Sequence, residues 1–94
     1  NMTIEERKKS IIQAGRKAVD ELIKVAEEPI VDSSDDLTAD KLKNAAATKK
    51  LAVFDAFEIL NRIEEEERLM DDLEKSKKDL NKPKFQGFAE GRKK

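Results

Sequence analysis

Apolar residues recur through the first third of the chain at the spacing expected for one face of an α-helix. The residues spaced seven apart are Ile4, Ile11, Ala18 and Val25, with Gly15 and Leu22 between them, and Ile12, Val19, Ile23 and Ala26 widen the same face. Thr3 and Glu6 form the T-x-x-E pattern of a capping box, which favours a helix start at this point. Pro29 disfavours helical geometry at the residue before it. The pattern therefore predicts a helix over residues 3–28.

Gly15 falls in the middle of this predicted helix. A glycine costs a helix interior about 1 kcal/mol relative to alanine. Ala14 and Ala18 lie beside it, so the surface around Gly15 carries only small side chains. We therefore expect the backbone of another helix to approach closely at Gly15.

The residues from 39 to 80 predict a second and longer helix. No Pro or Gly occurs between Thr38 and Asn81, and Thr38 is the expected N-cap, with Asp36 as the alternative. The Asp/Ser-rich residues within 29–38 predict a loop. At 1.5 Å per residue the second helix would be ~63 Å long, against ~38 Å for the first. Folded back on each other, the two helices form an antiparallel helical hairpin, and their overlap ends at about residue 63 or 64.

Residues 51–63, LAVFDAFEILNRI, are apolar around most of the helix circumference. A surface helix with one partner needs an apolar arc of about 100°, and this segment exceeds it. Either further copies of the same chain or an additional neighbouring domain would cover the surplus. We expect self-assembly into an oligomer, in the form of a ring. The residues predicted to reach neighbouring copies are Leu51, Val53, Phe54, Phe57, Leu60 and Ile63.

The composition supports an all-α fold and removes most catalytic chemistry. The chain is 44% charged and 4% aromatic, and it has only 3 Gly and 2 Pro, too few for a turn-rich β protein. The absence of Cys and His excludes disulfides, thiolate nucleophiles, imidazole catalysis and Cys/His zinc sites. No glycine-rich phosphate loop occurs. We expect a protein that is not an enzyme and that holds no cofactor and no metal.

An acidic run follows the apolar segment, over residues 64–67 with Asp71, Asp72 and Glu74. Oxygen ligands of this kind suit Mg²⁺ or Ca²⁺. However, no glycine-containing loop is present to wrap an ion, and Arg68 lies among the carboxylates. The pattern favours a solvated helix flank with ion pairs between residues four apart, such as Glu64 with Arg68.

The charge is divided unevenly along the chain. Residues 1–74 carry 12 basic and 19 acidic side chains, whereas residues 75–94 carry 8 basic and 2 acidic ones. The last segment, residues 81–94, lacks periodicity and predicts a flexible basic tail after a hairpin domain of residues 3–80. Three interpretations stay open for it: nucleic-acid binding, docking of a protein through FQGF, or a solubilising terminus. The candidate residues are Lys75, Lys77, Lys78, Lys82, Lys84, Phe85, Phe88, Arg92, Lys93 and Lys94.

The sequence also indicates a location away from membranes. No stretch approaches the roughly 20 apolar residues that a bilayer-spanning helix needs. The residues after Met2, TIEERKK, are polar and lack the apolar core of a secretory signal. We therefore expect an intracellular protein.

A helical hairpin with a longer second helix and an apolar centre resembles the oligomerisation core of small terminase subunits from T4-like phages and cyanophages. Two segments carry the resemblance: GRKAVDELIKVAEE, residues 15–28, and AAATKKLAVFDAFEILNRIEEEERLMDDL, residues 45–73. It implies a viral protein of the host cytoplasm that forms rings of more than four copies, binds double-stranded DNA and regulates the motor of the large terminase subunit. The family's frequent helix-turn-helix segment is not found in these residues, so DNA contact would fall to charged rims or to the basic tail.

Two other interpretations remain beside this one. A coiled-coil adaptor between proteins, dimeric or tetrameric, would have no nucleic-acid function. A helical accessory protein could instead bind nucleic acid through its tail, whatever its assembly state. The number of subunits distinguishes the coiled-coil adaptor from a ring. Binding that depends on salt identifies the nucleic-acid-binding accessory protein.

Overall fold

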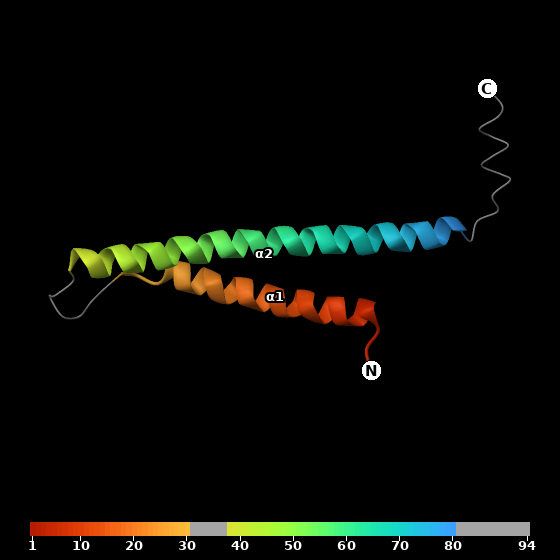
Figure 1. The fold of residues 1–94 in the computed structure, drawn as a ribbon, viewed down its shortest axis with the longest axis horizontal. Helices are drawn as coiled ribbons and strands as arrows, with labels where there is room; N and C mark the ends of the chain where they lie inside the picture. The colour runs from red at the N-terminus through yellow and green to blue at the C-terminus, as the bar shows by residue number, and fades with distance from the viewer. Residues whose placement is uncertain (31–37, 81–94) are drawn as a thin grey trace, which may run out of the picture. The chain divides into compact units, whose positions relative to one another are not determined.

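The computed structural model describes residues 1–30 and 38–80. They form two helices, α1 (Ile4–Glu27) and α2 (Ala39–Leu80), and these residues contain no strand. Figure 1 shows the two helices connected as a hairpin, which confirms the all-α fold predicted from the sequence. The chain divides between Ile63 and Glu64 into two units, and the first holds α1 packed on the first half of α2.

Local sequence signals set the helix ends. The Thr3 hydroxyl accepts from the Glu6 backbone N–H at 3.0 Å, while a Glu6 carboxylate oxygen accepts from the Thr3 N–H at 2.9 Å. The predicted capping box is therefore confirmed. Glu28 is extended, with φ −62° and ψ 131°, as expected for a residue before proline. At α2, the Thr38 hydroxyl accepts from the Lys41 N–H at 3.2 Å and acts as the predicted N-cap.

The predicted apolar face of α1 includes the residues that the structure buries, but part of its sevenfold repeat is left exposed. Ile4 and Ile11, which begin the predicted sevenfold repeat, are 78% and 65% exposed. The buried residues are Ile12 and Val19, one position further along. Ala18 and Val25, the later members of the repeat, are half-buried. The apolar face of α1 is wider than one column of residues, and spacing alone did not decide which column is buried against α2.

The close approach at Gly15 shows which column of α1 residues faces α2. A Cβ atom added at Gly15 would lie 3.2 Å from Ile63 Cδ1 and 3.4 Å from Ile59 Cγ2. A helix does pack closely at Gly15, but the nearest atoms belong to two isoleucine side chains and not to the backbone that was expected. Small residues of α2 continue this contact line, which we call the seam. Its buried or half-buried residues are Ile12, Gly15 and Val19 of α1 and Ala52, Ala56, Ile59 and Ile63 of α2.

A lysine completes the seam near the C-terminal end of α1. The Lys49 ammonium donates to the carbonyl oxygens of Val25 at 3.0 Å and Ala26 at 3.2 Å, and also to that of Glu28. The last carbonyls of a helix lack partners within the helix and carry its negative dipole end. Lys49 of α2 therefore caps α1, a long-range contact that the sequence analysis did not identify.

The second unit contributes residues 64–80 of α2 to the described structure. Its acidic run is helical, and Arg68 pairs with Glu65 at 3.8 Å, a spacing of three residues rather than the four predicted. Both side chains are exposed, so the pair contributes little to stability. Within residues 1–30 and 38–80, no three acidic side chains gather in a way that could hold a metal ion.

Candidate functional site

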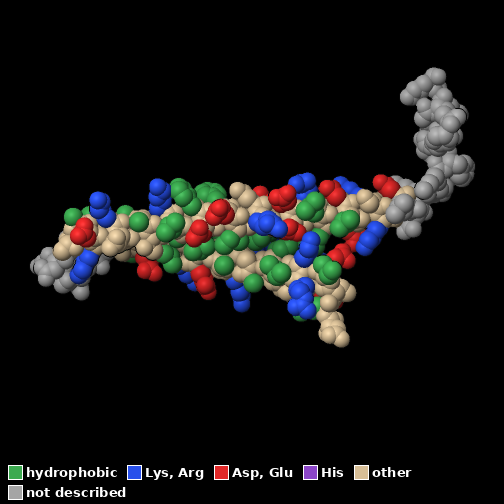
Figure 2. All heavy atoms as spheres, viewed as in Figure 1, with side chains coloured by type: hydrophobic (Ala, Val, Ile, Leu, Met, Phe, Trp, Pro, Cys, Tyr) green, Lys and Arg blue, Asp and Glu red, His purple; other side chains and the backbone are tan. Residues whose placement is uncertain are grey.

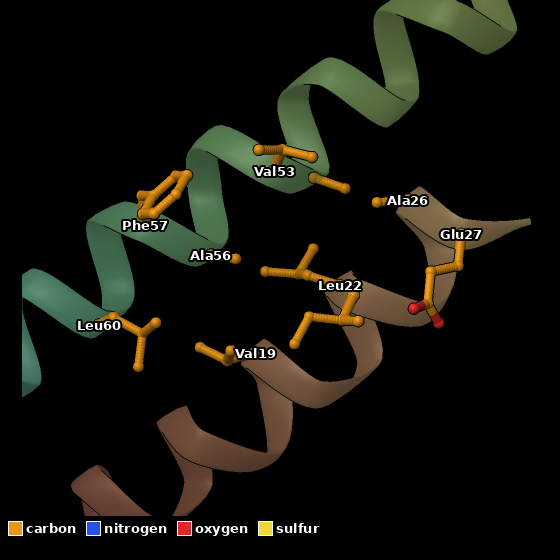
Figure 3. Close-up of a pocket in the computed structure, with 10 residues that line it drawn as sticks. Val19, Leu22, Ala26, Glu27, Val53, Ala56, Phe57 and Leu60 are labelled. Atoms are coloured by element: carbon orange, nitrogen blue, oxygen red, sulfur yellow. The ribbon is translucent and has the colours of Figure 1, made fainter.

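An apolar groove runs between α1 and α2 in the first unit. Its volume is about 320 Å³, and nine of its ten lining residues are apolar. Figure 3 shows the two walls facing each other, with Val19 of α1 and Leu60 of α2 pointing toward one another. The principal lining residues are Val19, Leu22, Ile23 and Ala26 from α1, and Val53, Ala56, Phe57 and Leu60 from α2.

The order of residue sizes along α2 produces this groove. The seam uses Ala52 and Ala56, whose small side chains let α1 approach closely. The neighbouring column on α2 carries the large side chains of Val53, Phe57 and Leu60, which rise beside the seam instead of filling it. The groove is therefore the hollow left between a close-packed line of small residues and a taller apolar wall.

The walls of the groove are poorly covered by the chain itself. Phe57 is 62% exposed, and Val53 and Leu60 are each 39% exposed. Ile23, on the α1 side, is also exposed. Fully burying one side chain of this size stabilises by about 1.5–3 kcal/mol, so a partner that fills the groove gains substantial hydrophobic free energy.

Leu51 and Phe54 lie outside the groove. They are 61% and 53% exposed, and neither contributes to the groove lining. Helical geometry turns them roughly 120° away from the Val53, Phe57 and Leu60 column. We call this pair the ridge. The Lys50 ammonium lies 5.4 Å from the centre of the Phe54 ring, within the range of a cation–π contact.

The six residues predicted as an oligomer interface thus separate into three places. Val53, Phe57 and Leu60 line the groove, and Leu51 and Phe54 form the ridge. Ile63 is only 6% exposed and packs beside Gly15, so it belongs to the seam within one chain. Figure 2 shows apolar side chains along the line where the helices meet and again on the edge of α2 that faces away from α1.

The predicted basic residues of the last segment are mostly beyond what the structure describes. Lys75, Lys77 and Lys78 are exposed on α2, in the second unit. The others lie outside the described residues: Lys82, Lys84, Phe85, Phe88, Arg92, Lys93 and Lys94. The three interpretations of the basic tail therefore stay predictions.

The groove has the character of a packing surface. Its single charged lining residue is Glu27, and no second titratable side chain lines it. Neither α1 nor α2, over the residues described, offers an apolar stretch sufficient to cross a bilayer. Comparison of the chain with protein-family models, with curated proteins and with solved structures yields no match.

Proposed function

We propose that this chain is a self-assembling, non-enzymatic subunit whose copies associate through the exposed apolar residues of α2. The observation that carries the proposal is the groove, with Phe57 exposed over most of its surface in a single chain. Contiguous apolar surface on a soluble protein marks an interaction site. An oligomer removes this surface from water without requiring any further component.

The proposed role of the assembly follows from the resemblance to small terminase subunits. In this role the chain forms a ring of more than four copies in the host cytoplasm and acts between double-stranded DNA and the large terminase subunit during viral DNA packaging. Residues 75–94 carry the net positive charge that a phosphate backbone would attract. The same segment contains Phe85 and Phe88, which would serve a protein partner.

A coiled-coil adaptor without nucleic-acid function is the second candidate. Ala52, Ala56, Ile59 and Ile63 alternate spacings of four and three residues, as the core positions of coiled coils do, and they use this spacing to pack on α1 within one chain. This candidate predicts two or four copies and no affinity for DNA. A packaging ring predicts a larger assembly and DNA binding that weakens steeply with salt.

The mass of the native assembly tests the proposal. Light scattering or native mass spectrometry of the wild-type chain should give a mass several times that of one copy. The double variant Phe57→Glu, Leu60→Glu should give the mass of one copy while the helical circular dichroism is largely kept, because both side chains are exposed in the single chain. The matched control is Lys17→Gln, Glu21→Gln, at two exposed residues of α1 that line neither apolar surface, and it should keep the wild-type mass. An unchanged mass for the Phe57, Leu60 variant would contradict the interface.

A further inference from the structure

We infer that the association is heterologous: the ridge of one copy, Leu51 and Phe54, seats in the groove of the next copy. This inference rests on the proposed self-assembly and names the surface that completes the interface. The apolar segment 51–63 contributes to both surfaces. Val53, Phe57 and Leu60 line the groove together with α1, whereas Leu51 and Phe54 lie beside it on α2.

The direction of the two surfaces is the first argument. Phe54 and Phe57 are neighbours three residues apart, but the arc from Leu51 through them to Leu60 spans roughly 180° of α2, so one flat partner surface does not cover all of it. If two copies paired groove to groove about a two-fold axis, Leu51 and Phe54 would remain in water in both copies. Insertion of the ridge into the groove removes both apolar surfaces from water with a single type of contact.

The size of the groove is the second argument. A cavity of about 150 Å³ accommodates a benzene molecule. The groove offers about 320 Å³, room for two side chains of the size of Phe54 and Leu51. These two residues are three apart in α2, so both project from the same part of the helix surface and can enter one groove together.

The Phe54 edge of the ridge carries a charge opposite to that of the groove, which is the third argument. Glu27 is the charged residue that lines the groove, at the C-terminal end of α1. The Phe54 ring carries the Lys50 ammonium at 5.4 Å, and Lys43, seven residues earlier, lies on the same side of α2. Lys50 lies at the Phe54 edge of the ridge, whereas Asp55 and Glu58 lie beside Leu51, so the Phe54 edge is the part that brings positive charge toward Glu27.

The consequence for assembly follows from symmetry. A contact between two different surfaces leaves one unused groove and one unused ridge on every pair of copies. Further copies add until the chain of subunits closes into a ring or continues as a filament. A contact between two identical surfaces stops at a dimer.

Two variants that each disable one surface test this inference. The ridge variant is Leu51→Glu, Phe54→Glu, and the groove variant is Phe57→Glu, Leu60→Glu. Each should be monomeric alone, with its Kd for self-association raised by roughly a hundredfold or more. Mixed in equal amounts, they should form a heterodimer and nothing larger, because the intact ridge of the groove variant meets the intact groove of the ridge variant. Native mass spectrometry distinguishes these species directly.

Other outcomes are equally decisive. A ridge variant that keeps the wild-type mass, while the groove variant is monomeric, would overturn the inference and leave the proposed self-assembly standing. Two monomeric variants that form no complex when mixed would also overturn it. A monomeric wild type would instead contradict the proposed function itself. If the glutamate variants lose helicity, the serine versions of the same four substitutions are used, and the same outcomes decide.

A charge exchange provides an independent measurement on the full-length chain. Glu27→Lys and Lys50→Glu should each weaken assembly several-fold, measured by light scattering at low ionic strength. The double variant, which exchanges the two charges, should recover most of the loss if the residues meet across the interface. Purely additive weakening in the double variant would contradict the ridge-in-groove contact.

Discussion

Two faces of the same stretch of α2 are built on opposite principles. The face toward α1 sets the small side chains of Ala52 and Ala56 beside Ile59 and Ile63, and Ala52 is only 3% exposed. The faces directed away from the seam carry the largest apolar side chains of the helix, and Phe54 and Phe57 are both more than half exposed. A helical hairpin stabilised by its own core alone would place its largest apolar side chains against α1 and its smaller ones toward water.

The difference indicates that the fold of one chain and its association with others use separate residues. Close packing of small residues brings the two helix backbones together without consuming the large side chains. Those large side chains then remain available for a partner. Stability of the hairpin and strength of association should therefore respond to different substitutions, and the following predictions test this separation.

The largest effect is expected for a charge in the seam. Ala52→Glu places a carboxylate where the neutral side chain is buried against α1, which should cost more than about 3 kcal/mol of unfolding free energy. Urea unfolding followed by circular dichroism at a fixed protein concentration measures it. The control is Ala14→Glu, at an exposed alanine of α1, which should change the unfolding free energy by less than about 0.5 kcal/mol. Equal losses in both variants would contradict the assignment of Ala52 to the seam.

A smaller loss is expected at the lysine that caps α1. Lys49→Met keeps most of the aliphatic stem but removes the donor to the carbonyls of Val25, Ala26 and Glu28. Hydrogen bonds from a charged donor contribute about 1.5–3 kcal/mol, and partial exposure of Lys49 reduces this, so about 1–2 kcal/mol should be lost. Lys50→Met, at the exposed neighbour, is the matched control and should cost less than about 1 kcal/mol. Urea unfolding compares the two variants. A larger loss of unfolding free energy for Lys50→Met than for Lys49→Met would contradict the role of Lys49 in stabilising the hairpin.

The smallest effect on the single chain is expected for the deletion of a large apolar side chain. Phe57→Ala should lower the unfolding free energy of the dissociated chain by less than about 1 kcal/mol, because Phe57 is 62% exposed there. The same substitution in a core typically costs about 3–5 kcal/mol. Unfolding measured over a dilution series separates the stability of the single chain from the stability added by association. Only the part that depends on protein concentration should fall. A core-sized loss at every concentration would show that Phe57 stabilises the hairpin itself.

The elements of the fold could be predicted from the sequence because their signals are local. Thr3 with Glu6, Pro29 and Thr38 each act within a few residues of the helix end that they determine. The register of α1 could not be predicted, since Ile11 and Ile12 are equally apolar and only contact with Ile59 and Ile63 at Gly15 selects between them.

The sequence predicted which apolar residues are exposed, but not how they divide between the groove and the ridge. The excess of apolar residues over 51–63 identified the exposed segment, and five of the six interface candidates are indeed exposed. The division into groove and ridge depends on where α1 lies against α2, and residue spacing within α2 alone does not contain that information. Lys49 was missed for the same reason, because its acceptors lie 21 to 24 residues away in sequence.

The Lys49 contact also bears on how the hairpin forms. The carbonyls of Lys24 and Val25 accept from the Glu28 backbone N–H, yet the last turn of an isolated 24-residue helix still frays. Once α2 docks, one ammonium group binds the carbonyls of Val25 and Ala26 in α1 and that of the C-cap Glu28 at the same moment. Completion of the first helix is thereby coupled to arrival of the second, so the two should form and melt in a single cooperative transition rather than one after the other.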